Sequence, residues 1–578
     1  MKINDVERIT GLTQKAIRLY ESKGLIRISR DVNGYRNFSK EDVEKLKNIK
    51  LFRSVGISLS DIKLYLFGVM SIDELIDKRK SEILKESGKN SEKYRVCESI
   101  SNMTSLKNLE NTKHFTENEK VKIKSHGALS VGIDIGTTTV SAVVYDIDNK
   151  EQLEAFSVPH NSYVYSDFRS EQSVSVIMEK SEKLLYHILG SYQGIVSIGI
   201  SGQMHGIVYT DAGGNAVSNL INWQDKRADK ILDVGKSVCQ MILEITKENI
   251  STGYGIATHY YNMLNGEVPS EAVSFCSIMD FFSMKICGIK KALTHTSIAS
   301  SFGLFDIKKG GFMIDRLLLL GIDEGFLPLV TADSIIIGKC KGIPVSVAIG
   351  DNQASFLGSI RENAQSMLIN VGTGSQISVA SDYIELNGDI ELRPLIEGKY
   401  LICGSALCGG FAYSMLEAFF RSYTVSAGMQ ETSQYKVLNK LAKEAYESKE
   451  AGLCVDAFFC GKRSDPNCRG SIKMIDRQNF TPSALLIGVL KGICNELYEL
   501  YETFPEKRIH IVASGGAIEK NDVLKMLMSE CFSAPVSFNT VKEEAAMGAA
   551  LFSAFVTKKI KYNNGFFDYI NYTGEFLQ

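Results

Sequence analysis

Residues 131–146 read VGIDIGTTTVSAVVYD, which predicts an apolar strand, a Gly/Thr turn and a second apolar strand. Gly136 lets the backbone turn tightly, so that the amides and hydroxyls of the three following threonines can face phosphate oxygens. Asp134 ends the first strand, where a carboxylate is placed to hold a hydrated Mg²⁺ beside those phosphates. An ordinary glycine-containing β-turn is the alternative, because the motif alone is only moderately specific. The threonines are Thr137, Thr138 and Thr139.

A second strand, Gly/Thr turn and strand occurs at 368–378, LINVGTGSQIS. Two copies of one phosphate-binding unit are expected if two similar domains close around ATP. Glycine pairs precede helices in the stretches 404–420 and 510–530, where backbone amides and a flat surface suit adenine and ribose. The small-residue stretch 543–551, EEAAMGAAL, is expected to pack closely beneath this nucleotide site. The residues expected on the nucleotide are Gly372, Thr373, Gly409, Gly410, Gly515 and Gly516.

Two polar turns in the middle of the chain are typical of polyol binding. SIGISGQMHGIVY, 197–209, runs from a strand into a polar turn, and LINWQDKRA, 220–228, brings the single tryptophan, Trp223, beside amide and carboxylate groups. An aromatic face suits sugar C–H surfaces, while amides and carboxylates suit paired hydroxyls. His205 by itself is more often a structural histidine, but its place in a GQMHG turn favours a ligand-binding role. The residues expected on a sugar are Gln203, Met204, His205 and Asp225.

A candidate catalytic base follows a buried-looking strand in VSVAIGDNQASFLGS, residues 345–359. Asp351 comes directly after Gly350 at the end of this strand. A carboxylate placed there can accept the proton of a substrate hydroxyl as that hydroxyl attacks a γ-phosphate. The alternative is an aspartate that only caps the following helix.

The first seventy residues have a different pattern. Residues 3–26 predict a helix, a tight turn at Thr10-Gly11 and a second helix capped by Thr13. A basic second helix after such a turn is the arrangement that enters a DNA major groove. The segment 27–39 predicts a basic hairpin around Asn33-Gly34. The alternative is a small basic domain without a DNA partner. The residues expected on the exposed face of the second helix are Gln14, Lys15, Arg18 and Tyr20.

Length and charge indicate several domains with different partners. A chain of 578 residues predicts about 3 to 4 domains. Residues 1–125 carry 26 Lys and Arg against 18 Asp and Glu, whereas the remainder carries 39 against 49. A basic front and an acidic body suggest two kinds of partner. With no signal peptide and no apolar run of about 18 residues, we expect a cytoplasmic protein whose 12 cysteines stay reduced.

The front of the chain resembles the winged-helix DNA-binding domain of the MerR family of regulators over about seventy residues. The resemblance rests on TGLTQKAIRLYESKGLI, the NGYRNFS wing and the helical stretch after it. It implies operator binding as a homodimer. In MerR-like proteins the segment corresponding to 71–113 is an antiparallel dimerisation helix; a long solvated linker helix is the alternative here. The residues that the resemblance places on double-stranded DNA are Arg18, Tyr20, Tyr35 and Arg36.

The body resembles the FGGY family of carbohydrate kinases over about 430 residues. DIGTTT, GQMHG, WQDKR, GDNQAS, NVGTGSQ and SGGA occur in the family's order, and the WQD turn resembles the sedoheptulokinase branch more than the xylulokinases. The resemblance implies an α/β actin-like fold of two ribonuclease-H-like domains and an ATP- and Mg²⁺-dependent ketose kinase. It further implies that Asp351 is the base and Asp134 the metal-side residue, and it assigns the phosphate, sugar and nucleoside contacts to the residues named above.

We therefore expect an N-terminal α-helical winged helix-turn-helix domain followed by a two-domain sugar kinase. The alternatives are a transcription regulator that uses a kinase-like body as a sugar sensor, a kinase for another ketose or polyol such as xylulose, and a front module that only dimerises. The expected segments are a DNA-binding domain at 1–70, a helical linker or dimerisation segment at 71–127, kinase domains at 128–357 and 358–560, and an aromatic surface-packing tail at 561–578.

Overall fold

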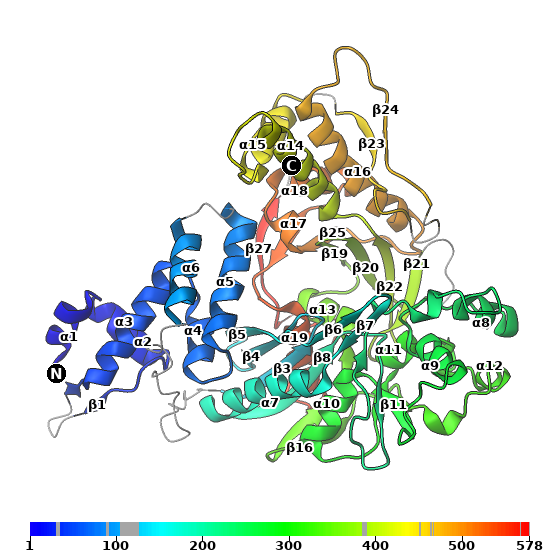
Figure 1. The fold of residues 1–578 in the computed structure, drawn as a ribbon, viewed down its shortest axis with the longest axis horizontal. Coiled ribbons are helices and arrows are strands. Elements are labelled where there is room, and N and C mark those ends of the chain that lie inside the picture. Colours follow the sequence, from blue (N-terminus) through cyan, green and yellow to red (C-terminus); the bar gives the residue numbers. More distant parts are fainter. Residues whose placement is uncertain are drawn as a thin grey trace.

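Three bodies follow one another along the chain in the computed structural model: a helical front module and two α/β lobes (Figure 1). The structure describes residues 1–30, 35–87, 92–104, 127–383, 390–449, 452–462, 465, 467–563, 565, 566 and 568–576. The Asn33-Gly34 turn and nearly all of the charged linker expected at 111–128 lie outside the described residues.

The front module is a helix-turn-helix with a short hairpin and two further helices. Gly11 ends the first helix in a left-handed conformation (φ 64°), and the Thr13 side chain accepts a hydrogen bond from the Ala16 amide at 3.2 Å, as predicted. Ile17 and Phe52 are fully buried in its core. The elements are α1 (Ile3–Thr10), α2 (Gln14–Ser22), β1 (Ser29–Arg30), β2 (Arg36–Asn37), α3 (Lys40–Ser54) and α4 (Leu59–Leu66).

The segment expected to dimerise is a helical hairpin within the chain. Helix α5 (Ile72–Ser87) packs against α6 (Glu92–Thr104), and Lys80 donates to the Ser101 hydroxyl at 2.8 Å. Leu75, Ile76 and Ile83 of α5 are buried. The apolar side of α5 is therefore covered inside one chain, so a partner copy would have to use another surface of this hairpin.

The N-terminal lobe is built around the opening hairpin. Strand β3 pairs antiparallel with β4 and parallel with β8, and both hairpin strands are almost wholly buried because α7, α10 and α19 pack on the sheet. The sheet order is β16-β17-β8-β3-β4-β5, with β18 beside β8. Its described strands are β3 (Leu129–Ile135), β4 (Thr139–Asp146), β5 (Glu151–Pro159), β8 (Ile195–Gly202), β16 (Ile336–Cys340), β17 (Ile343–Ser346) and β18 (Ile349–Gly350).

Helices and short strands complete this lobe. The helices are α7 (Val174–Ser191), α8 (Val238–Thr246), α9 (Gly255–Leu264), α10 (Ile278–Cys287), α11 (Thr296–Ala299), α12 (Ile314–Leu319) and α13 (Asp351–Ser359). The short strands are β6 (Tyr163–Ser166), β7 (Arg169–Gln172), β9 (Val208–Thr210), β10 (Leu220–Ile221), β11 (Ser274–Cys276), β12 (Leu293–His295), β13 (Phe305–Asp306), β14 (Gly311–Phe312) and β15 (Leu329–Thr331).

The C-terminal lobe repeats this plan. Its hairpin β19/β20 is antiparallel, and β19 pairs parallel with β25. The sheet order is β21-β22-β20-β19-β25-β26-β27, so the C-terminal tail supplies an edge strand rather than only packing on the surface. The strands are β19 (Ser366–Val371), β20 (Ser375–Ser381), β21 (Ile390–Pro394), β22 (Tyr400–Ala406), β25 (His510–Ser514), β26 (Val536–Asn539) and β27 (Tyr572–Phe576). Beside it lie β23 (Cys454–Asp456), β24 (Ser471–Lys473), α14 (Gly410–Ser426), α15 (Tyr435–Glu447), α16 (Pro482–Glu502), α17 (Gly516–Glu519) and α18 (Asp522–Phe532).

Helix α19 (Glu544–Val556) crosses back to the N-terminal lobe. It packs on β3, β8 and α13 rather than beneath the nucleotide site, which corrects the prediction for 543–551. Its close packing is as predicted: a Cβ built on Gly132 would lie 1.8 Å from the Ala546 carbonyl oxygen, and one on Gly548 would lie 1.8 Å from that of Ala354. Only glycine permits backbones to approach this closely.

The front module is docked on the N-terminal lobe, beside β5 and α7 (Figure 1). The Lys63 ammonium lies 2.8 Å from Glu154, and Lys180 lies 2.6 Å from Glu74. Lys78 donates to the Ser157 carbonyl oxygen at 2.8 Å. These are partly or fully buried polar contacts between two bodies, so the module is held in one orientation against the lobe.

Candidate active site

The parallel strands of the N-terminal lobe end together, and their ends carry three of the predicted residues. Asp134 on β3 is opposite Ser201 on β8, and Ser201 is also opposite Ile349 on β18. Gln203 directly follows β8, and Asp351 directly follows β18. Ligands of open α/β sheets bind beyond the carboxyl ends of the strands, and the structure brings these side chains to that edge.

The Asp351 charge influences the ionisation of Asp134. Burial, and after it the negative charge of Asp351, raise the pKa of Asp134 to about 7. Burial likewise raises the pKa of Asp351 to about 6, although the positive charge of Arg393 opposes this rise. Asp134 Oδ1 is buried without a hydrogen-bond partner. The two carboxyls thus form a desolvated pair that favours a cation or a proton.

The turn between β3 and β4 is held from outside while its tip stays open. Trp223 Nε1 donates to Thr137 Oγ1 at 3.1 Å, and Gln172 Nε2 donates to the Thr137 carbonyl oxygen at 2.7 Å. Thr138 is exposed at the tip, and Thr139 begins β4. The structure therefore places Trp223 against the predicted phosphate turn.

The GQMHG turn lines a cavity of about 200 Å³ between the lobes. His205 has φ 72°, and both its amide and its Nδ1 bond to Ser301, at 3.0 and 2.9 Å. Its ring stacks on Tyr254 with centroids 4.5 Å apart. Met204 also lines the cavity, and its sulfur accepts a contact from Asn352 Nδ2 at 3.8 Å. Asp351 is thereby linked to the cavity through its neighbour in sequence.

Gln203 is buried and does not line this cavity. Its Nε2 donates to Gln172 Oε1 at 2.9 Å and to the Gly136 carbonyl oxygen at 3.3 Å, while its Oε1 is buried without a partner. The side chain links the sugar turn to the phosphate turn.

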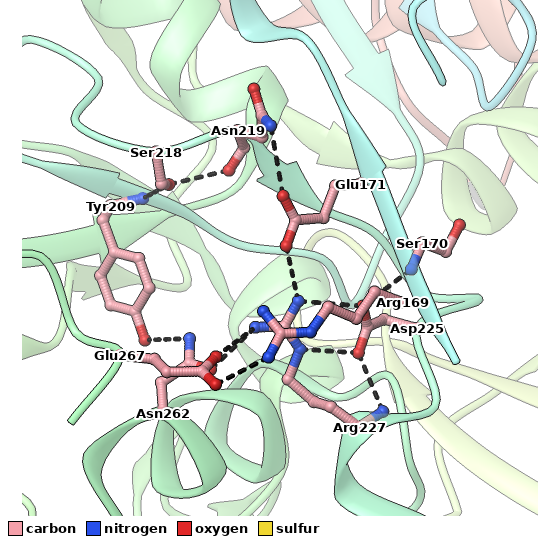
Figure 2. A network of polar contacts seen from close by, with 10 residues as sticks. All are labelled: Arg169, Ser170, Glu171, Tyr209, Ser218, Asn219, Asp225, Arg227, Asn262 and Glu267. Atoms are coloured by element: carbon pink, nitrogen blue, oxygen red, sulfur yellow. Dashed lines mark hydrogen bonds and ion pairs between the residues drawn. The ribbon is translucent and has the colours of Figure 1, made fainter. Parts of the chain in front are cut away.

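Asp225 is placed differently from the prediction (Figure 2). Its side chain is fully buried and accepts hydrogen bonds from the Ser170 amide at 2.9 Å and from Arg227 Nε at 2.8 Å. Arg227 in turn donates to Glu171 and Asn262, at 2.8 Å each. The carboxylate is thus enclosed by protein donors, and its role in this geometry is to hold the WQDKR turn in position.

The predicted nucleotide glycines meet in the C-terminal lobe. The Gly410 amide donates to the Gly372 carbonyl oxygen at 2.8 Å, and the Gly409 amide donates to that of Thr373 at 3.1 Å. Gly515 has φ 97°, and a Cβ there would lie 2.6 Å from the Val371 carbonyl oxygen. A Cβ on Gly516 would meet nothing within 4 Å. The glycines therefore let three chain segments touch and leave open space in front of α17.

No group of three or more His, Cys, Asp or Glu side chains that could hold a metal ion occurs among the residues that the structure describes. Asp134, a desolvated carboxylate with an unused oxygen, fits Mg²⁺, which keeps several waters and takes its other ligands from substrate phosphates.

Of the six residues predicted to contact DNA, three are exposed and three are buried or bound within the module. Lys15 and Arg18 are exposed on α2, and Tyr35 is 70% exposed at the hairpin. Tyr20 is 7% exposed and belongs to the core, which corrects its predicted exposure: it lies three residues after Ile17 and shares its buried side of the helix. Two others are bound within the module, because Gln14 donates to Asn4 and Glu7 and Arg36 pairs with Glu21 at 2.6 Å.

Sequence reasoning missed several residues of the cleft. Tyr254 and Ser301 lie in the stretches TGYGIAT (252–258) and THTSIASSFGLFD (294–306), which resemble the sedoheptulokinase branch but gave these two residues no individual role. Gln172 and Arg393 lie in stretches with no distinguishing pattern, and their positions follow only from the folded structure.

Two α/β lobes of one plan, a cleft with paired carboxylates and glycine-built turns on both sides define a two-lobed small-molecule kinase, here preceded by a helix-turn-helix module. Residues 129–358 and 367–556 match the N-terminal and C-terminal domains of the FGGY family of carbohydrate kinases, and residues 1–67 match the MerR HTH family regulatory protein. The chain belongs to the FGGY family of carbohydrate kinases and carries a MerR-type domain at its N-terminus.

Relatives share the kinase part. Sedoheptulokinase of Mus musculus is 24% identical over 467 residues, which are 73% of this chain and 96% of that protein. Xylulose kinase of Staphylococcus xylosus is 25% identical over 454 residues, covering 74% of this chain and 90% of that protein. The chain is therefore a phosphotransferase of the sugar kinase type.

Solved structures confirm the fold. The ligand-bound xylulose kinase of Lactobacillus acidophilus aligns with a TM-score of 0.66 and 19% identity over 78% of this chain and 93% of that chain. The gluconate kinase of the same organism gives a TM-score of 0.66 at 20% identity, over the same shares of the two chains. The predicted actin-like fold is thus confirmed. No helix in the described part of the chain is long and apolar enough to cross a membrane.

Proposed function

We propose that the chain is an ATP-dependent ketose kinase that phosphorylates the terminal hydroxyl of sedoheptulose to give sedoheptulose 7-phosphate. The observation that carries this proposal is the position of Asp351, which begins α13 at the strand ends, beside Asp134 and next to the cavity that Met204 and His205 line. The similarity to sedoheptulokinase supports the choice of sugar.

Asp351 acts as the general base. With a pKa of about 6, it is mostly ionised near neutral pH yet basic enough to accept the proton that the sugar hydroxyl releases during attack on the γ-phosphate. His205 and Met204 hold the sugar so that its terminal hydroxyl faces this carboxylate. Orientation of this kind supplies much of the rate in phosphoryl transfer.

The two Gly/Thr turns hold the phosphates from opposite lobes. The N-terminal lobe presents the amides and hydroxyls of Thr137, Thr138 and Thr139. The C-terminal lobe presents the amides of Gly372 and Thr373 and the Thr373 hydroxyl. Gly409, Gly410, Gly515 and Gly516 provide the surface for the nucleoside. Asp134 would hold Mg²⁺ through water. When bound, the ion neutralises charge on the β- and γ-phosphates.

Asp351→Asn tests the assignment. The amide keeps the shape of the site but cannot take the proton, so we expect ADP formation with sedoheptulose to fall by about 10²- to 10⁴-fold while sugar binding persists. Asp315→Asn, at an exposed carboxylate, is the matched control and should keep full activity. Full turnover in Asp351→Asn would remove Asp351 as the base.

The same assay tests two alternative functions. A sugar sensor would bind ketose and form no ADP in the wild type. A kinase for xylulose or another polyol would form ADP with that substrate and little with sedoheptulose, so the wild type is screened with ketoses and polyols of five to seven carbons.

For the front module, we propose operator binding as a homodimer. Lys15, Arg18 and Tyr35 are exposed on the faces that a helix-turn-helix and its wing present to DNA. Selection from random double-stranded DNA at fixed salt would recover an enriched site if this is correct, and the recovered duplex gives the stoichiometry. Recovery of no sequence would contradict it.

A further inference from the structure

The C-terminal lobe contributes two charged side chains, Glu391 and Arg393, to the cavity that the sugar turn lines. Arg393 lies on the edge strand β21, and the cavity of about 200 Å³ is lined by Glu391, Leu392 and Arg393 together with residues of the N-terminal lobe that include Met204 and His205. The Arg393 side chain is 10% exposed although it is on an edge strand. It is enclosed between its own sheet and the N-terminal residues that line the cavity, such as Tyr254.

One nitrogen of the Arg393 guanidinium donates no hydrogen bond to the described residues. Its Nε and Nη2 donate to Glu391 Oε2, at 3.2 and 2.5 Å. Nη1 is buried and has no hydrogen-bond partner. A buried donor without an acceptor costs roughly 1 to 3 kcal/mol, so an arginine kept in this state is explained most simply by an acceptor that arrives with a ligand.

The position of Arg393 is fixed relative to the catalytic base. Gln353 lies in the first turn of α13, two residues after Asp351, and its Nε2 donates across the lobes to the Pro394 carbonyl oxygen at 2.9 Å. Gln353 is fully buried. One hydrogen bond thus ties the helix that carries the base to the residue next to Arg393, and the guanidinium lies close enough to Asp351 for its charge to lower the pKa of that carboxyl.

We propose that Arg393 is a substrate-binding residue delivered by the C-terminal lobe, whose Nη1 donates a hydrogen bond to a hydroxyl or carbonyl oxygen of the sugar. This rests on the proposed function. The acceptor is a neutral oxygen because the Glu391 carboxylate already compensates the guanidinium charge, and Asp351 adds a second negative charge nearby. A sugar acid would bring a third carboxylate to one cation, so the site selects neutral ketoses over aldonates.

The proposal is tested by calorimetric titration of sedoheptulose, and separately of gluconate, into the full chain holding a non-hydrolysable ATP analogue, together with steady-state kinetics. Arg393→Met keeps the apolar stem and removes the donors, and Arg393→Lys keeps the charge but not the fork. Arg421→Met is the matched control, since Arg421 pairs with Glu417 on α14, outside the cavity lining. Thermal unfolding of every variant reports on folding.

We expect Arg393→Met to weaken sedoheptulose binding and raise its KM by about 10- to 100-fold, with kcat and the KM for ATP changed by less than about threefold, because the contact exists before and during transfer. Arg421→Met should match the wild type in both. Equal sugar affinity in wild type and Arg393→Met overturns the inference and leaves the kinase proposal intact. Gluconate binding that depends on Arg393 more than sedoheptulose binding does also overturns it. A wild type that binds no sugar refutes both proposals.

Discussion

Glu154→Gln is expected to loosen the docking of the front module. Glu154 lies on edge strand β5, 2.8 Å from the Lys63 ammonium, and the Lys63 side chain is 3% exposed. Glu154 also accepts a hydrogen bond from the Tyr192 hydroxyl. The substitution keeps the shape of the residue and one acceptor oxygen but leaves the ammonium buried without its counter-charge.

The magnitude follows from burial. Breaking a buried ion pair by neutralising one partner costs about 3 to 5 kcal/mol, and we take the lower end because the Glu154 side chain is 17% exposed and water reaches it. The Lys47–Glu44 pair, with side chains 45% and 66% exposed, gives a matched control: Glu44→Gln should cost less than about 0.5 kcal/mol.

Urea unfolding followed by far-ultraviolet circular dichroism measures the difference. Glu154→Gln should lower the free energy of the first transition by about 3 kcal/mol, and the double variant Lys63→Met/Glu154→Met should recover most of it, because the unpaired charge is then removed. If Glu154→Gln and Glu44→Gln unfold at the same urea concentration, the buried pair does not hold the module and the reasoning fails.

Two further outcomes are expected. The value of kcat/KM should rise with an apparent pKa of about 6 to 7, because Asp351 must be ionised to act as base and burial raises its pKa and that of Asp134. Arg393→Met should move this apparent pKa upward, because it removes a positive charge that favours the ionised carboxylate. An apparent pKa near 4 in the wild type would contradict this prediction. Gly132→Ala should destabilise the kinase by about 3 kcal/mol or more, since its Cβ would meet the Ala546 carbonyl oxygen, whereas Gly311→Ala, with nothing within 4 Å, should leave the melting temperature nearly unchanged.

Local chemistry made much of the cleft predictable. A Gly/Thr turn alone is also compatible with an ordinary β-turn, but the order of the motifs located both turns, Asp134 and Asp351 before any tertiary information. The strand pairing then explains their meeting, because β3, β8 and β18 run parallel and end together.

What escaped prediction depends on which groups become partners after folding. Asp225 has the right chemistry for a sugar, yet Arg227, two residues later, folds back on it, and the pair is enclosed by Glu171 and Asn262 (Figure 2). The Tyr20 hydroxyl suggests exposure, whereas the spacing of three residues from Ile17 places the ring on the buried side of the helix. The role proposed for Arg393 depends on the cavity that it forms with residues of the opposite lobe, which the sequence around it does not indicate.

The docking surface offers a physical route between sugar and DNA. The Gln152 side chain on β5 exchanges two hydrogen bonds with the backbone of Lys542, at 2.8 and 3.0 Å, and Lys542 leads into α19. Because α19 packs on β3, β8 and α13, we expect any closure of the lobes around sugar and nucleotide to be transmitted to β5, where Glu154 pairs with Lys63 of the front module. Ligand coupling through this route would change affinity for the selected DNA site by about 5- to 150-fold, and Glu154→Gln should abolish that change while leaving catalysis intact. If the wild type binds DNA with the same affinity with and without ketose and nucleotide at matched salt, sugar binding and DNA binding are not coupled.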